Sequence, residues 1–209
     1  MTAYRTLFMY LAKALSAPLF AAALVSCATT TYSGGDARSM TVPITRNAYY
    51  GKPQASPQKT VDAYMEQGIM FASRDEFEPA IRNFTEALKL DPNYAGAYCN
   101  RGVAYAATGD YPRAIADLNQ AIKLDPNYTN VYYYRGVSYA AAGAYDYAIA
   151  DFNYAAKLDP SNAEIYNGRG ITYIRKGDYD SARADFKRIL QINPNDEFAL
   201  FLLAQLDGQ

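Results

Sequence analysis

The sequence predicts an all-α solenoid of four helix-turn-helix repeats, closed by a C-terminal capping helix. Three residue types recur at intervals of 34 positions. The glycines are Gly68, Gly102, Gly136 and Gly170, the alanines are Ala80, Ala114, Ala148 and Ala182, and the prolines are Pro92, Pro126, Pro160 and Pro194. Three residue types in phase over four copies indicate an internal repeat, which as a stack of helix pairs buries one continuous core.

The spacing within a repeat predicts where each helix begins and ends. The copies cover 61–94, 95–128, 129–162 and 163–196, with a helix A followed by a helix B in each. A glycine inside a helix costs about 1 kcal/mol relative to alanine, so we expect the glycine of helix A and the alanine of helix B to let the two helices touch. Asp-Pro or Asn-Pro ends helix B, because proline disfavours helical geometry at the residue before it. Gly109, Gly143 and Gly177 mark the turns between helices A and B.

This pattern resembles the tetratricopeptide repeat, a family of antiparallel helix pairs stacked into an α-solenoid. The resemblance implies a protein or peptide ligand in the concave groove that helix A lines. The residues of this chain at the matching positions are Met65, Ile69, Cys99, Val103, Ala106, Asn130, Tyr133, Val137, Asn167, Ile171 and Ile174. We also expect Cys99 to be a buried small apolar residue.

The groove positions are small or apolar, and none of them is lysine or arginine. Family members that hold the acidic C-termini of heat-shock chaperones use lysine, asparagine and arginine there, so that ligand is disfavoured. An amphipathic helix or an extended apolar peptide suits such a groove better. The alternative is that the groove is empty and that edges or loops of the array carry binding.

Two further positions of the repeat change together. The seventh residue is Arg101, Arg135 and Arg169 in copies two to four, and the twenty-third is Asp117, Asp151 and Asp185. Copy one has Gln67 and Asn83 instead. We therefore predict an Arg–Asp ion pair within each of the last three copies, bidentate if geometry allows, and an amide contact in the first. The alternative is two unrelated exposed charges.

Tyrosine is abundant, with 21 residues and no tryptophan in the chain. It recurs at the fourth position of every copy, as Tyr64, Tyr98, Tyr132 and Tyr166. We expect these rings to fill the wedge between helices A and B, with each hydroxyl reaching the surface or a backbone partner.

Residues 1–26 have the layout of a secretory signal peptide, with Arg5 and Lys13 ahead of an apolar run from Ala14 to Val25. As a helix this run covers roughly 18 Å, which is short of a hydrocarbon core of about 30 Å. It ends in Leu24-Val25-Ser26-Cys27, which resembles the bacterial lipobox and implies acylation of Cys27. Residues 27–60 then read as the lipidated cysteine and a flexible tether. The alternatives are an ordinary signal peptide that happens to precede a cysteine, and an uncleaved anchor.

Acylation of Cys27 would hold the protein on a lipid bilayer of the bacterial cell envelope. Ala28, rather than aspartate, follows the cysteine. By resemblance to sorted lipoproteins, this favours the outer membrane, facing the periplasm, if the host has two membranes.

The C-terminal segment 197–209 is predicted to be a capping helix, and its apolar residues go most of the way around it. A cap normally shows a polar face to water. The segment therefore either folds into the end of the groove, or forms a self-interface that makes a homo-oligomer, or is a cap with some exposed apolar surface.

The composition excludes several classes of function. A net charge of −1 gives no basic field for nucleic acid. The absence of histidine removes the commonest general base and metal ligand, so we expect neither an enzyme nor a metal or other cofactor. The expected function is a membrane-anchored scaffold or adaptor for protein partners. The alternatives are a small-ligand-binding envelope protein and an assembly factor for pilus or outer-membrane complexes.

Overall fold

The structure is a computed structural model that describes residues 60–208, and these residues form nine α-helices and no strands. The helices are α3 (Val61–Ala72), α4 (Phe77–Leu90), α5 (Ala95–Ala107), α6 (Tyr111–Leu124), α7 (Thr129–Ala141), α8 (Tyr145–Leu158), α9 (Ala163–Lys176), α10 (Tyr179–Ile192) and α11 (Glu197–Asp207). The predicted signal peptide, Cys27 and the tether up to residue 59 lie outside the described residues.

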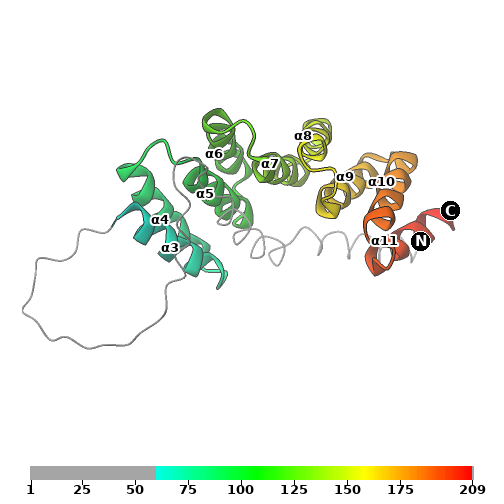
Figure 1. The fold of residues 1–209 in the computed structure, drawn as a ribbon, viewed down its shortest axis with the longest axis horizontal. Helices are drawn as coiled ribbons and strands as arrows, with labels where there is room; N and C mark the ends of the chain where they lie inside the picture. The colour runs from blue at the N-terminus through cyan, green and yellow to red at the C-terminus, as the bar shows by residue number, and fades with distance from the viewer. Residues whose placement is uncertain (1–59, 209) are drawn as a thin grey trace, which may run out of the picture.

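The helices form antiparallel pairs that succeed one another along the long axis of the molecule, from α3 and α4 at one end to α10 and α11 at the other (Figure 1). Helices α3, α5, α7 and α9 are the A helices, and α4, α6, α8 and α10 are the B helices. Each A helix packs on the B helix of its own pair, and α3, α5 and α7 also touch the next A helix. Because neighbours approach more closely on the inner side of a curved array, the A helices define the concave side.

The turns between helices A and B use one backbone conformation. Gly109, Gly143 and Gly177 have φ of 82°, 79° and 87°, a region that side chains with a Cβ rarely adopt. The first copy has Asp75 at this place, with φ of 60°. A left-handed conformation costs a non-glycine residue roughly 1–2 kcal/mol, although aspartate tolerates it better than most. The glycines therefore predicted the A–B turns of copies two to four. The A–B turn of copy one adopts the same geometry with an aspartate in place of the glycine.

The turns between repeats are stabilised by a side chain as well as by proline. Asp91 accepts a hydrogen bond from the backbone N–H of Asn93 at 2.9 Å, across the intervening proline. Asp125 and Asp159 make the same bond in the next two turns, at 3.0 and 3.1 Å. This side-chain turn is a property of aspartate and asparagine, which explains why the residue before each proline is one of these two.

The helix A glycines face a large residue of helix B, and in copy two a Cβ on Gly102 would also lie 3.1 Å from the carbonyl oxygen of the recurring Ala114. A Cβ built on Gly68 would lie 2.7 Å from Cδ1 of Phe84 and closer still to Cε1, and one on Gly136 or Gly170 would lie 3.0 Å from the equivalent Phe152 or Phe186. In copy two the opposing residue is Leu118, 2.9 Å away. The close approach of the helices therefore makes room for a buried ring or leucine, while the alanines lie in the same core.

The C-terminal helix α11 packs on α10, as expected for a capping helix. Ala199, Leu202, Leu203 and Leu206 are buried with residues of α9 and α10 in one cluster. Arg183 of α10 donates Nη2 to the carbonyl of Leu206 at 2.5 Å and Nε to Asp207 at 3.0 Å. A cation at this end of a helix also complements its dipole. Leu200 and Phe201 remain 48% and 42% exposed, so α11 is a cap with some exposed apolar surface.

Candidate functional site

The predicted groove residues all lie on the A helices. Two come from α3, three from α5, three from α7 and three from α9. Most of them are buried: Met65, Cys99, Val103, Ala106, Val137, Ile171 and Ile174. The half-buried ones are Ile69, Asn130, Tyr133 and Asn167. These four side chains therefore supply the exposed part of the predicted groove.

Tyr133 is the one ionisable phenol of the predicted groove. Its ring lies 5.9 Å from that of Phe152 and 5.2 Å from that of Tyr134, measured between centroids. A Cβ on Gly168 of the next copy would lie 2.9 Å from Cε1 of Phe152 and 3.4 Å from Cε2 of Tyr133, so this glycine lets α9 pack closely against the Phe152 ring beside Tyr133. Burial raises the pKa of the Tyr133 hydroxyl, which therefore stays neutral in the physiological range.

Sequence reasoning missed Asn100, which lies on α5 beside the groove residue Cys99. Its side chain has no exposed surface, and neither its Oδ1 nor its Nδ2 has a hydrogen-bond partner. The buried Oδ1 of Asn167 on α9 is also without a partner. The equivalents of Asn100 in the other copies are Glu66, Tyr134 and Gly168, so no pattern in the sequence marks this position.

The predicted Arg–Asp pairs are present in copies two to four, and each is bidentate. Arg101 donates Nε and Nη2 to the two carboxylate oxygens of Asp117 at 2.7 and 2.8 Å. The pairs Arg135–Asp151 and Arg169–Asp185 have the same arrangement, with distances between 2.5 and 2.9 Å. In copy one, Asn83 donates Nδ2 to the carbonyl of Pro79 in its own helix at 2.9 Å, and its contact with Gln67 stays a prediction.

Each of these arginines also reaches back to the preceding repeat, which the sequence reasoning did not anticipate. Arg135 donates Nη1 to Asn119 at 2.6 Å, and Arg169 donates Nη1 to Asn153 at 2.5 Å. In copy two the acceptor is Thr85, at 3.1 Å from Arg101. The acceptor stands 16 residues before the arginine and the aspartate 16 residues after it. The three arginines therefore join helix B of one repeat to both helices of the next.

Tyrosine rings flank the same arginines. The guanidinium carbon of Arg101 lies 5.7 Å from the ring centroid of Tyr98 and 5.9 Å from that of Tyr105. These distances are within the range of cation–π attraction. The hydroxyls of Tyr132 and Tyr166 donate to the carbonyls of Pro126 and Pro160 at 3.0 and 3.1 Å, as expected for fourth-position tyrosines.

The electrostatic balance of the pairs varies between copies. Hydrogen bonds to Asp117 and Asp185 raise the pKa of Arg101 and Arg169, against the opposing effect of burial. For Asp185, burial raises the pKa more than the hydrogen bonds and charge of Arg169 lower it. Asp185 is also the most deeply buried of the three aspartates, with 4% of its surface exposed.

The described residues contain no group of histidine, cysteine, aspartate and glutamate that could hold a metal ion. Among the described helices, none has both the length and the apolar character needed to cross a bilayer.

Comparisons with known families agree with this geometry. Tetratricopeptide repeat profiles match residues 95–128 and 133–197, and a TPR repeat profile matches residues 62–109. Together these matches cover more than half of the chain. A search of curated proteins found no match.

Several solved structures have the same fold. A crystal structure of MamA protein is 25% identical with a TM-score of 0.65, over 72% of this chain and 82% of that one. TTC0263, a thermophilic TPR protein of Thermus thermophilus, is 24% identical with a TM-score of 0.63, over 74% and 84%. The TPR domain of Arabidopsis OM64 is 27% identical with a TM-score of 0.52, over 54% and 93%. The repeats, the helix pairs and these matches together show that the chain belongs to the tetratricopeptide repeat family.

Proposed function

We propose that this protein is a membrane-anchored scaffold of the bacterial cell envelope, which holds a protein partner through a peptide or helix bound in its concave groove. Its fold is that of a protein–protein interaction scaffold, and tetratricopeptide repeat proteins are typically non-catalytic. The observation that carries the groove assignment is the unpartnered amide of Asn100, which lies on α5 next to the groove residue Cys99 in the chain.

A buried amide without partners is unfavourable in the unbound protein. Leaving a buried donor or acceptor unsatisfied costs about 1–3 kcal/mol. The main chain of a peptide offers one N–H and one C=O per residue, which complement the donor and acceptor of an asparagine amide. A partner that supplies these bonds recovers the lost free energy, so Asn100 favours the bound state over the unbound state.

Binding at Asn100 requires a local opening. The side chain has no exposed surface, whereas Ile69, Tyr133 and Asn167 are half-buried. A partner would therefore contact these three residues first and reach Asn100 as the concave side opens. Apolar contacts at Ile69 and Tyr133 would supply affinity, and the amides of Asn100 and Asn167 would fix the position of the bound backbone.

The substitution Asn100→Ala tests this role by separating stability from binding. We expect the free energy of unfolding to stay the same or rise, because an unsatisfied amide is removed. Partner affinity should fall about tenfold, which corresponds to the loss of about 1.4 kcal/mol of hydrogen bonding. Affinity capture from solubilised membranes with the full-length protein gives the partner, and urea denaturation gives the stability. Unchanged binding would exclude Asn100 from the site.

A pair of charge-matched variants locates the binding face. Ile69→Glu with Asn167→Glu adds two negative charges to the concave side, and Ala116→Glu with Ala150→Glu adds two to exposed positions of the B helices. We expect a partner to be lost from the first variant and kept by the second, while both keep the helical circular dichroism of the parent. Loss from the second alone would place binding on the outer side.

The membrane anchor rests on Cys27 and the preceding tripeptide. We expect the mature chain to begin at Cys27, to carry acyl chains and to partition into the detergent phase of a Triton X-114 extract, because two or three chains suffice for stable anchoring. The Cys27→Ser variant should appear in the aqueous phase. Intact mass and non-reduced peptide mapping check the chemistry. A Cys27–Cys99 disulfide, or a chain that retains residues 1–26, would contradict the proposal, because the acylated sulfur is unavailable for a disulfide.

A further inference from the structure

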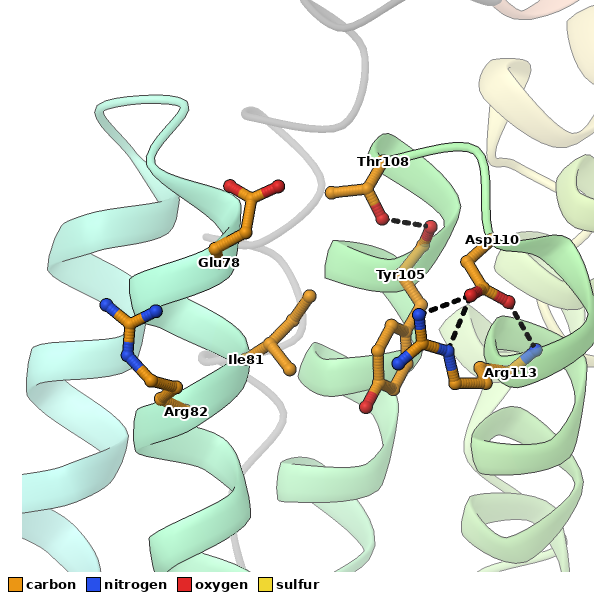
Figure 2. Close-up of a pocket in the computed structure, with 7 residues that line it drawn as sticks. All are labelled: Glu78, Ile81, Arg82, Tyr105, Thr108, Asp110 and Arg113. Carbon is orange, nitrogen blue, oxygen red and sulfur yellow. Dashed lines mark hydrogen bonds and ion pairs between the residues drawn. The ribbon is translucent and has the colours of Figure 1, made fainter.

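A second candidate site lies between the first two repeats, away from the predicted groove residues. Figure 2 shows a cleft of about 400 Å³ between α4 and the corner where α5 turns into α6. Glu78, Ile81 and Arg82 line it from α4, and Tyr105 and Thr108 line it from α5 and its end. None of these belongs to the concave set or to the Arg–Asp pairs.

The charges on the corner side of the cleft are satisfied within that side. Arg113 donates Nε to Asp110 at 2.5 Å, and its guanidinium carbon lies 4.5 Å from the centroid of the Tyr105 ring. Thr108 donates its hydroxyl to the carbonyl of Tyr105 at 2.9 Å (Figure 2). This wall is therefore neutral, and the Tyr105 ring already has a cation beside it.

The α4 side differs, because the charges of Glu78 and Arg82 are not paired with another residue that lines the cleft. Glu78 and Arg82 lie one turn apart with Ile81 beside them, and no hydrogen bond or ion pair joins either of them to another residue drawn in Figure 2. The carboxylate of Glu78 faces the cleft across from Thr108. A ligand for this side needs a cation for Glu78 and an apolar part for Ile81.

The repeat itself shows what this carboxylate lacks. Two repeats further on, Asp146 occupies the position of Glu78 and Lys176 that of Thr108. There Lys176 donates Nζ to Asp146 at 2.6 Å, across the junction between copies three and four. The junction between copies two and three has Pro112 and Ala142 at these positions, with neither charge. The first junction thus has the acid without the lysine.

We propose that this cleft binds a lysine side chain of a protein partner, whose ammonium takes the place beside Glu78 that Lys176 Nζ holds beside Asp146. Ile81 and the edge of the Tyr105 ring contact the methylene groups, which lysine buries readily while its charged end stays near water. Arg82, one turn along α4, favours an acidic residue next to that lysine in the partner. The site does not depend on the concave groove, so a scaffold could use both.

The direct test is a titration of the full-length, isotope-labelled protein in detergent micelles with Nα-acetyl-lysine methylamide, followed by amide chemical shifts. We expect saturable shifts at Glu78, Thr108 and Gly109. The norleucine analogue, which has the same stem without the ammonium, should bind about fivefold more weakly, the ratio that an ion pair of about 1 kcal/mol gives. Absence of saturable shifts, or equal binding of the two compounds, overturns the proposal.

Two variants separate the site from a general effect of charge. Thr108→Lys supplies the cleft with its own ammonium, as Lys176 does, and should abolish the shifts while the melting temperature stays at or above that of the parent. Glu78→Gln should reduce lysine binding to the level of norleucine. If Thr108→Lys binds the lysine compound as the parent does, the ammonium is not held at Glu78. If Nα-acetyl-glutamate methylamide binds more tightly, the cleft is an anion site at Arg82, and the proposal is wrong.

Discussion

The substitution Arg169→Ala is expected to destabilise the protein by about 3–5 kcal/mol, the range found when one partner of a buried ion pair is removed. Asp185 is only 4% exposed, and both of its carboxylate oxygens receive hydrogen bonds from Arg169. The variant leaves this carboxylate buried without a cation. Because each repeat contacts only its neighbours, we expect faster amide exchange in α9, α10 and α11 first.

The stability that the Arg169→Ala variant loses should depend on pH, and the buried carboxyl group of Asp185 determines the direction of this dependence. Burial already raises the pKa of Asp185 in the parent, and without Arg169 it rises further. An acid whose pKa is raised on folding binds its proton more readily in the folded than in the unfolded chain, so lowering the pH favours the folded state. The deficit of the variant should therefore be full at neutral pH and shrink as the pH falls through the raised pKa. Urea denaturation curves at several pH values, compared with the parent, measure this.

Two control variants test whether burial of the Arg169–Asp185 pair causes the loss of stability. Asp185→Asn in the Arg169→Ala background removes the unpaired charge, and it should recover part of the stability at neutral pH. Lys176→Ala breaks an ion pair whose side chains are 44% and 82% exposed, and it should cost at most about 1 kcal/mol. If the two single variants lose equal stability, burial of the Arg169–Asp185 pair has no special role.

The substitution Gly68→Ala is expected to destabilise the protein by up to about 2 kcal/mol, although alanine is the better helix former. The added Cβ would lie 2.7 Å from Cδ1 of Phe84, a ring with no exposed surface that cannot swing away. Overpacking of this kind costs about 1–3 kcal/mol, and it is offset by up to about 1 kcal/mol of helix propensity. Thermal and urea unfolding, followed by circular dichroism, measure the net effect.

Gly96→Ala is the matched control, because it replaces a glycine near the start of α5. Its Cβ would lie 3.2 Å from the half-buried ring of Tyr94, which has room to move. We expect this variant to be neutral or slightly more stable than the parent. In the Gly68→Ala background, Phe84→Leu should recover part of the loss, since copy two has Leu118 at that position. A Gly68→Ala variant as stable as the parent would show that the first helix pair can separate freely.

Much of the fold could be predicted because its determinants are local. The glycines of three A–B turns, the Asp-Pro pairs and the recurring glycine of helix A each follow from what one or two residues allow the backbone to do. The Arg–Asp pairs could also be predicted, since Gln67 and Asn83 change together in the copy that lacks them. Asp75 could not, because the first turn takes its left-handed geometry from the helices that it joins.

The candidate sites were less predictable, because they depend on contacts between repeats. The eleven groove positions follow from the family pattern, but the burial of Val103 and the exposure of Ile69 depend on what packs around each A helix. The isolated amide of Asn100 shows no periodicity, and the cleft at Glu78 becomes visible only when Thr108 is seen opposite it.

The sequence by itself determined the class of this protein, its four-copy repeat, the ends of most helices and the pairing of three arginines with three aspartates. These features recur in several copies of the repeat, which makes the pattern visible in the sequence. Each of them depends on residues that are close together in the chain or within one helix pair. The tertiary structure alone decided that the same arginines reach Thr85, Asn119 and Asn153 of the preceding repeat, that α11 caps α10, and which polar groups remain without partners. These depend on how neighbouring repeats are stacked, and hydrogen bonding and burial across such a junction are set by packing in three dimensions.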